Sequence, residues 1–441
     1  MPNPLIEHGR PRLRALRIAS AGAVLALAAV ATGCTSSAQP APSSTPGPTS
    51  TAAATPALPA DAAALTATFQ NAAKSLMVPG AAMLIRTPDG DITATYGTTE
   101  LGGTTPVSLD DHIRVGSNTK TWTGTVILQL AQEGRLALTD PVSKYRPDVP
   151  NGDNITIEEL LNMRSGLFNY TETYQLNHDL DVDPGKVWNP EELVAMGLAL
   201  PPYFAPGTGF HYSNTNTVLL GLIAQQLDGK PLQQIFQDRL FTPLGLTNTS
   251  FPASDDASIP APYSNGYMYT DNVQTLATAT LPADLLAQAQ AGTLLPNDFT
   301  ATNPSWAWSA GAGISTIGDL ATWVEALGGG TGDLLNADMQ QQRMQSVIGV
   351  PNSAGGAGYG WGIARMGPIF YGHTGELPGY NSYMGYDPVN KVTMVVWTNL
   401  APSADGRPPA ATLAADLIGE LYGTATATPT PGSGSGSDDT E

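Results

Sequence analysis

The chain has 441 residues, of which 41% are hydrophobic, so it is long enough for a large folded domain with additional segments. Its 38 acidic and 19 basic residues give a net charge of −19, which argues against nucleic acid or an anionic lipid surface as a partner. The single cysteine, Cys34, excludes an internal disulfide bond.

The N-terminus carries the features of a secretory signal. Four arginines fall between residues 10 and 17, and an apolar run over 18–32 follows them. This run is too short for a dependable membrane-spanning helix, so we predict a signal peptide over residues 1–33. Ala31-Thr32-Gly33 ahead of Cys34 resembles a bacterial lipobox, with alanine in place of the usual leucine at the first position. We therefore expect export across the cytoplasmic membrane and lipidation of Cys34 on its outer face; plain secretion with a free thiol is the alternative.

Low-complexity composition marks both ends of the remaining chain. Residues 34–60 are rich in Ser, Thr, Pro and Ala and contain hardly any large apolar side chain, which predicts a flexible tether. Residues 424–441 contain Pro and Gly-Ser repeats and an acidic end, which predicts a disordered tail. One folded domain is expected between them, over residues 61–423.

Apolar periodicity predicts strands at both ends of this domain and helices between them. Residues 61–77 have helical spacing, and two apolar runs flank Pro88-Asp89-Gly90, as in a β-hairpin. The expected strands cover 81–86, 92–96, 369–373, 380–386 and 391–398, and a closing helix covers 413–421. This order predicts an α+β fold, in which both chain ends build one antiparallel sheet flanked by helices and a mostly helical subdomain is inserted.

A serine and a lysine lie at the predicted start of a buried helix. Ser117 and Lys120 are three residues apart, so they share one face of that helix. A serine hydroxyl is a weak nucleophile that needs a nearby base, and a half-buried lysine has a pKa lowered enough to serve as one. Because Ser-x-x-Lys also recurs by chance, two further segments have to support this interpretation.

The second segment holds Tyr212 and Asn214 on a loop before a predicted helix. Near a lysine cation the pKa of a tyrosine is expected to fall, and the phenolate then becomes a base. The carboxamide of Asn214 can donate to and accept from a substrate amide. The alternative is a packed Tyr212 and a helix-capping Asn214.

The third segment is 371–376, with the sequence Tyr-Gly-His-Thr-Gly-Glu. We expect it at a strand edge, where its glycines let a ligand approach the backbone. The backbone amides of Ser117 and Glu376 can then form an oxyanion hole. A purely structural role is the alternative for His373.

Together these segments resemble the penicillin-recognising serine hydrolases, in the branch shared by class C β-lactamases, serine D-Ala-D-Ala carboxypeptidases and related esterases. The resemblance covers about residues 65–422 and implies the β-lactamase/transpeptidase-like form of the α+β fold. It extends to the segments 114–117, 155–167, 212–216, 241–246 and 309–319. The histidine of the third segment, and Ser213 in the second, are most similar to secreted D-Ala-D-Ala carboxypeptidases.

The resemblance implies a role for each candidate residue. Ser117 is the acylated nucleophile, and Lys120 is its proton partner. Tyr212 is the base that takes the serine proton, and His373 helps to set the charge of the site. The implied substrate-binding residues are Asn214, Thr374, Gly375, Glu376 and Arg365.

Glu376 departs from the family pattern, which has a small or hydroxyl residue here in carboxypeptidases. The resemblance places this position near the carboxylate of the substrate, where a second negative charge is unfavourable. Arg365 is expected to offset it, by pairing with Glu376 or by binding the substrate carboxylate itself. The departure favours an esterase or another amide hydrolase over a carboxypeptidase.

The sequence as a whole predicts an extracytoplasmic serine hydrolase that works through an acyl-enzyme, D-Ala-D-Ala carboxypeptidase-like on cell-wall peptides. The alternatives are an esterase or weak β-lactamase on the same site, and a non-catalytic envelope lipoprotein that binds muropeptides or a partner. The expected ligands are small peptides, esters or β-lactams. We expect no nucleic acid, no cofactor, no metal, a monomer, and membrane contact only through the lipid anchor.

Overall fold

The computed structural model of the chain describes residues 56, 59–330, 334–351, 353 and 356–423. All of them belong to one compact unit that spans Ala52–Glu441. The predicted signal peptide, Cys34, nearly all of the tether and the predicted tail lie outside the described residues. Within the described ranges, no helix has the length and apolar character that a bilayer crossing requires.

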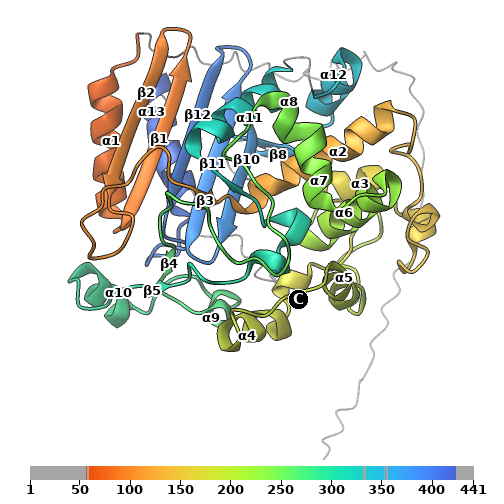
Figure 1. Cartoon of the computed structure of the whole chain (residues 1–441), viewed down its shortest axis with the longest axis horizontal. Coiled ribbons are helices and arrows are strands. Elements are labelled where there is room, and N and C mark those ends of the chain that lie inside the picture. Colours follow the sequence, from red (N-terminus) through yellow and green to blue (C-terminus); the bar gives the residue numbers. More distant parts are fainter. Residues whose placement is uncertain (1–55, 57–58, 331–333, 352, 354–355, 424–441) are drawn as a thin grey trace, which may run out of the picture. The chain divides into compact units, whose positions relative to one another are not determined.

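An eight-stranded sheet forms the centre of this unit, in the order β2-β1-β12-β11-β10-β9-β8-β7 (Figure 1). Its strands are β1 (Gly80–Thr87), β2 (Gly90–Gly97), β7 (Ile348–Gly349), β8 (Gly358–Tyr359), β9 (Ala364–Met366), β10 (Phe370–Leu377), β11 (Tyr380–Asp387) and β12 (Val392–Thr398). The N-terminal hairpin joins the C-terminal strands through antiparallel pairing of β1 with β12, with Ala81 opposite Thr398. The prediction that both chain ends build one antiparallel sheet is confirmed.

Helices cover both faces of this sheet. On one face α1 (Ala62–Ser75) and α13 (Pro409–Tyr422) pack against each other and the strands, and α11 (Ile317–Gly329) packs on the opposite face (Figure 1). β12 is buried along its whole length and β1 along nearly all of it, because their apolar side chains point into both layers. Phe69 and Leu417 belong to the core on the α1 side, and Trp323 belongs to the core on the other side.

The long middle of the chain is mostly helical, as predicted. Its helices are α2 (Thr119–Gln132), α3 (Ile157–Leu161), α4 (Tyr174–Val182), α5 (Pro190–Leu198), α6 (Asn214–Asp228), α7 (Leu232–Phe236), α8 (Thr242–Leu244), α9 (Asn272–Thr275), α10 (Ala283–Gln290) and α12 (Ala337–Gln345). Two pairs of very short strands accompany them: β3 (Ile113–Arg114) with β6 (Ile314–Ser315), and β4 (Tyr267–Met268) with β5 (Asn297–Asp298). Strands of two residues show no alternation, so the sequence does not reveal them.

Helix α2 passes through the core rather than along the surface. Every residue from 119 to 130 is buried, and α6 packs along it. A one-turn helix, η1 (Gly116–Asn118), leads into α2 and packs against β10 and β11. The start of α2 therefore meets the sheet at β10, which brings the first and third candidate segments together.

Candidate active site

Ser117 and Lys120 are in direct contact at the start of α2. Lys120 Nζ lies 2.9 Å from Ser117 Oγ and donates to the carbonyl oxygen of Ala310 at 2.7 Å. The Lys120 side chain is buried, and this desolvation lowers the pKa of its amine well below the ordinary value. The expected spacing and pKa direction are both present, so the amine that faces the serine hydroxyl loses its proton more readily than that of a solvated lysine.

Two glycines let the nucleophile turn approach β10 closely. Gly116 has φ +56°, and a Cβ atom built on it would lie only 2.5 Å from the backbone nitrogen of Glu376. A Cβ on Gly375 would lie 1.9 Å from the carbonyl oxygen of Val115. A glycine is therefore required at position 375 because protein backbone packs against it. The sequence had instead suggested that this glycine lets a ligand approach. The close contact sets the amide of Glu376 beside the residue that precedes Ser117.

Hydrogen bonds from β11 hold this turn in place. The Ser382 hydroxyl donates to the carbonyl oxygen of Val115 at 3.0 Å, and Asn118 Nδ2 donates to Ser382 Oγ at 2.8 Å. β9 pairs only with residues 370–372 of β10, so residues 373–377 have no strand on that side among the described residues. Thr374 and Gly375 lie in this open stretch, as the prediction of a strand edge requires.

Tyr212 lies beside the lysine, but its pKa moves opposite to the prediction. Lys120 Nζ lies 4.8 Å from the centre of the Tyr212 ring. Burial of the hydroxyl raises the Tyr212 pKa, and the opposing effect of nearby Ser117 is smaller. The hydroxyl forms no hydrogen bond of ordinary geometry within the described residues. The expected phenolate is therefore wrong for the resting site, because desolvation outweighs the opposing effect of Ser117.

Asn214 is the first residue of α6, and Ser213 occupies the N-cap position. Asn214 Nδ2 donates to Thr171 Oγ1 at 3.0 Å and to Asn169 Oδ1 at 3.3 Å. These bonds fix the carboxamide so that its nitrogen faces protein. Its oxygen accepts no hydrogen bond from the part of the chain that the structure describes, so it can accept from a substrate N–H as predicted, and Ser213 rather than Asn214 holds the N-cap position.

His373 is neutral rather than a source of positive charge. Its Nδ1 lies 2.5 Å from the carbonyl oxygen of Thr374, which can only accept, so Nδ1 carries the proton. Its Nε2 lies 3.0 Å from the hydroxyl of Tyr359, which therefore donates to it. Burial first, and Lys120 second, lower the pKa of His373 to about 3. The expectation that His373 helps to set the site's charge is wrong, because the ring is desolvated and both nitrogens are engaged.

Glu376 presents a carboxylate beside the candidate oxyanion hole. Its side chain is the exposed one in β10, and Asn381 Nδ2 donates to its Oε2 at 3.0 Å. Desolvation by the surrounding protein raises its pKa to about 7, against the smaller effect of Asn381. Water reaches this exposed side chain and limits the rise.

Arg365 does not pair with Glu376. It lies on β9 opposite Tyr371, five residues before Glu376 along β10, and its Nε donates to the carbonyl oxygen of Gly356 at 3.0 Å. Five strand residues span roughly 16 Å, beyond the reach of one arginine side chain. The predicted pairing of Arg365 with Glu376 is wrong, because the short β8–β9 hairpin directs Arg365 to the far end of β10; binding of a substrate carboxylate by Arg365 stays a prediction.

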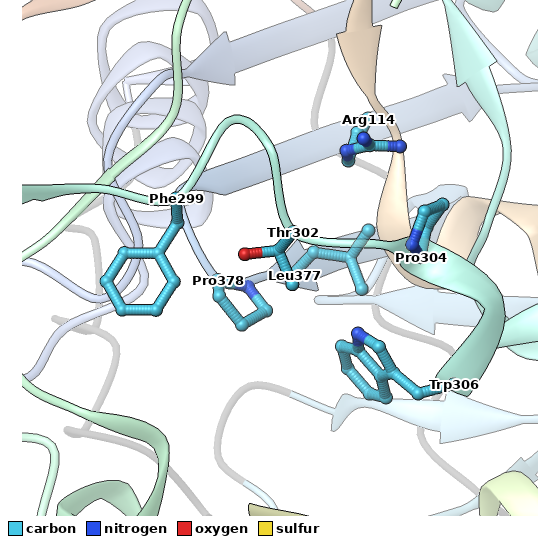
Figure 2. A pocket seen from close by; sticks show the side chains of 7 residues that line it. All are labelled: Arg114, Phe299, Thr302, Pro304, Trp306, Leu377 and Pro378. Carbon is cyan, nitrogen blue, oxygen red and sulfur yellow. The ribbon is translucent and has the colours of Figure 1, made fainter. Parts of the chain in front are cut away.

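A small pocket adjoins the end of β10. Its lining residues are Arg114, Phe299, Thr302, Pro304, Trp306, Leu377 and Pro378 (Figure 2). Leu377 and Pro378 follow Glu376 directly, and most of the lining is apolar. The Arg114 guanidinium is buried and donates to the carbonyl oxygen of Ala257 at 2.7 Å, and burial lowers its pKa. The pocket's volume of about 10 Å³ leaves room for about one water molecule.

Sequence reasoning missed three neighbours of the candidate residues. Ala310 accepts from Lys120 through its backbone, which leaves no side-chain signal. Tyr359 is the partner of His373 and lies on a two-residue strand, and Asn381 is the partner of Glu376 across the β10–β11 ladder. The ladder register alone could have identified Asn381. Among the described residues, no cluster of three His, Cys, Asp or Glu side chains is arranged to hold a metal ion.

Comparisons with known proteins agree with this geometry. The family described as Beta-lactamase matches residues 65–418. "Protein flp" from Staphylococcus aureus (strain N315) is 35% identical over 188 residues, which make up 41% of this chain and 36% of that protein. The chain thus matches little more than a third of the length of this curated relative.

Two solved structures extend the comparison over most of the chain. A D-stereospecific amidohydrolase from Streptomyces sp. is 29% identical with a TM-score of 0.67, and the match covers 82% of this chain and 99% of that chain. A D-amino acid amidase from Ochrobactrum anthropi SV3 is 25% identical with a TM-score of 0.63, covering 76% and 91% of the two chains.

Proposed function

The chain belongs to the Beta-lactamase family, and from that premise we propose that it is a serine amidohydrolase that works through an acyl-enzyme on Ser117. The observation that carries this proposal is the 2.9 Å contact between Ser117 Oγ and the buried amine of Lys120. A pure binding protein has no use for a desolvated amine held against a serine hydroxyl, because burying an ionisable group costs stability. The pairing is typical of nucleophilic catalysis.

In the proposed acylation step, neutral Lys120 takes the proton of Ser117 as Oγ attacks the substrate carbonyl carbon. The carbonyl oxygen becomes an oxyanion, which the backbone amides of Ser117 and Glu376 stabilise by hydrogen bonds. The resulting lysine ammonium is stabilised by the Ala310 carbonyl and by the face of the Tyr212 ring. The base is thus assigned to Lys120 rather than to a Tyr212 phenolate.

Breakdown of the tetrahedral intermediate needs a proton on the leaving nitrogen. The protonated hydroxyl of Tyr212 donates it, and Lys120 returns its extra proton to the tyrosine. The C–N bond breaks, the amine leaves, and an ester to Ser117 remains. Water then attacks this ester while Lys120 removes a water proton; the product acid leaves and Ser117 regains its hydrogen.

We propose small amides as substrates, with D-configured residues as the first to test. One matching structure is a D-stereospecific amidohydrolase, and its whole chain aligns with this one. The D-Ala-D-Ala carboxypeptidase expected from the sequence becomes the second candidate, because no cationic partner among the described residues offsets repulsion between the Glu376 carboxylate and a substrate carboxylate. An esterase or weak β-lactamase would use the same Ser117 chemistry.

The site of action remains a proposal from the N-terminal sequence. We propose export of the chain, lipidation of Cys34, and a monomeric hydrolase domain over residues 61–423 held by the tether. Globomycin treatment of cells, which blocks cleavage before a lipidated cysteine, should cause accumulation of the full-length precursor. Unchanged processing, or retention of the chain in the cytoplasm, would contradict the lipoprotein proposal.

Labelling with a fluorescent penicillin tests the acyl-enzyme. Wild type should gain one covalent label, read by gel fluorescence and intact mass, and Ser117→Ala should gain none. Ser75→Ala is the matched control, because Ser75 is an exposed residue at the end of α1. Equal labelling of wild type and Ser117→Ala would place the nucleophile elsewhere. Absence of label together with absence of p-nitrophenyl ester hydrolysis would favour the non-catalytic binder.

A further inference from the structure

Glu376 carries a carboxylate that has no counter-ion among the described residues. The hydrogen bond that it accepts within this part of the chain comes from the neutral amide of Asn381, which contacts one of its two oxygens. No ion pair involves Glu376 within the described residues, and desolvation rather than a nearby cation dominates its ionisation. A carboxylate held in this way gains stability from any cation that a ligand brings to it.

Asn381 holds this carboxylate in a defined position. Its Nδ2 donates to Glu376 Oε2 and to the carbonyl oxygen of Gly375 at 3.1 Å. Its Oδ1 accepts from the backbone nitrogen of Ala410 at 2.9 Å, in the first turn of α13. These hydrogen bonds prevent rotation of the Asn381 carboxamide. Asn381 is thus held by β10 and α13, and it restricts the position of the Glu376 carboxylate in turn. Such pre-organisation is what a recognition residue requires.

The position of Glu376 restricts what it can recognise. Its backbone nitrogen lies against Gly116, beside the nucleophile, and its side chain is exposed on the same strand. Because side chains alternate along a strand, Gly375 faces the nucleophile turn, whereas the Glu376 carboxylate lies with Asn381 on the face of β10 next to α13. It still belongs to the residue whose amide is assigned to the oxyanion, so a group attached close to the scissile carbonyl lies within the reach of this side chain. In an amino acid amide or a short peptide with a free N-terminus, the α-ammonium is the cation nearest to that carbonyl.

We propose that Glu376 is a specificity-determining residue that selects substrates with a free α-ammonium beside the scissile carbonyl and rejects those with a carboxylate there. The inference rests on the proposed acyl-enzyme function and narrows its substrate class to unblocked amino acid amides and short peptides. Asn381 is a positioning residue, because it acts by holding Glu376. The net charge of −19 favours the approach of such cationic substrates.

Three substrates with one scissile bond and one leaving group test the proposal. They are D-alanine p-nitroanilide, its N-acetyl derivative and its N-succinyl derivative, which place a positive, neutral and negative group near the same carbonyl. At pH 7 a free α-amine with a pKa of about 7.7–8.0 is mostly protonated. Wild type should show a kcat/KM roughly tenfold higher for the unblocked than for the acetylated substrate, as expected for one charge contact, and the lowest value for the succinylated one.

Variants separate charge selection from other causes. Glu376→Gln should reduce the unblocked-to-acetylated ratio to about twofold or less, chiefly through KM, and Glu376→Asp should restore part of it. Glu420→Gln is the matched control, because it removes one exposed carboxylate ten residues past Ala410 on α13, about 15 Å away; it should keep the wild-type ratio. In wild type itself, raising NaCl from about 0.05 to 0.5 M should lower the unblocked-to-acetylated ratio, because salt screens the charge contact. This measurement needs no variant and so does not depend on one folding well.

The outcomes distinguish this inference from the proposed function. If p-nitrophenyl acetate acylates Ser117 but the three anilides react equally, or Glu376→Gln keeps the wild-type ratio, charge selection by Glu376 is wrong and the acyl-enzyme stands. If neither the ester nor any anilide acylates Ser117, both proposals fail.

Discussion

The change Gly116→Ala should disable the oxyanion hole without unfolding the domain. Gly116 has a left-handed φ of +56°, where a side chain costs roughly 1–2 kcal/mol. The new Cβ would also lie 2.5 Å from the Glu376 nitrogen and 2.9 Å from the Gly375 carbonyl carbon. The first distance is about 0.9 Å shorter than the 3.4 Å at which ordinary contact begins, so backbone on one side has to move.

That movement displaces one of the two amides assigned to the oxyanion. A misplacement of about 1 Å, or loss of one oxyanion donor, typically lowers kcat by about 10²–10³-fold. We therefore expect the rate of Ser117 acylation by p-nitrophenyl acetate to fall at least about 100-fold. The burst of nitrophenol in stopped-flow measures this rate, and thermal unfolding measures the accompanying loss of stability.

Gly229→Ala separates the clash from the backbone strain. Gly229 has φ +66° at the end of α6, and a Cβ there would meet nothing within 4 Å. It should lose about 1 kcal/mol of stability and retain wild-type acylation. If folded Gly116→Ala acylates within about fivefold of wild type, the amides of Ser117 and Glu376 do not form the oxyanion hole.

Three further changes test the ionisation of buried groups. Lys120→Met should abolish acylation yet raise Tm at pH 7, because the folded pKa of Lys120 lies below its ordinary 10.5 and burial of this lysine therefore costs stability. The increase in Tm over wild type should shrink as pH rises towards 10.5. A lower Tm of the variant at pH 7 would contradict this reasoning. The pKa of Glu376 is raised to about 7 in the folded state from 4.5 in the unfolded state, so the folded state binds an extra proton between these values and the unfolding free energy of wild type should fall as pH rises from about 4.5 to 7. Urea denaturation of Glu376→Gln should lack this contribution to the pH dependence, and an unchanged dependence of the unfolding free energy on pH would contradict it. Tyr359→Phe leaves the buried His373 Nε2 without its donor and should lower the unfolding free energy by about 1–3 kcal/mol, measured by urea denaturation; Tyr371→Phe, on a half-buried tyrosine of the same sheet, should change it far less.

The central sheet could be predicted from the sequence because its strands carry long apolar runs. The hairpin around Pro88 and the three late strands appear at the expected positions, and β1 pairs with β12 as the order of elements requires. The edge strands β7, β8 and β9 have two or three residues each, too few to show periodicity. Missing them also misplaced Arg365, whose register opposite Tyr371 depends on that short hairpin.

The prediction of the site succeeded where spacing along a helix fixes the distance between two residues. It failed where burial determines whether a side chain is ionised. Ser117 and Lys120 meet because a separation of three residues places both side chains on one face of a helix. For Tyr212 and His373 the residue type can be read from the sequence, but the extent to which each side chain is buried cannot. Burial decides the ionisation state. The tyrosine was expected to lose its proton and the histidine to help set the charge of the site, but desolvation favours the neutral form of both side chains.

These reversals leave a resting site in which every buried group is driven towards its neutral form, and Tyr212→Phe tests what the tyrosine hydroxyl then does. The substitution keeps the ring that faces Lys120 and removes a hydroxyl that forms no hydrogen bond of ordinary geometry in the described residues, so folding should be preserved. If the hydroxyl protonates the leaving nitrogen, hydrolysis of a p-nitroanilide should fall about 10²–10⁴-fold, the usual contribution of a general acid. Hydrolysis of p-nitrophenyl acetate should fall less than about tenfold, because nitrophenolate leaves without a proton. Equal losses on both substrates would mean that Tyr212, rather than Lys120, removes the Ser117 proton.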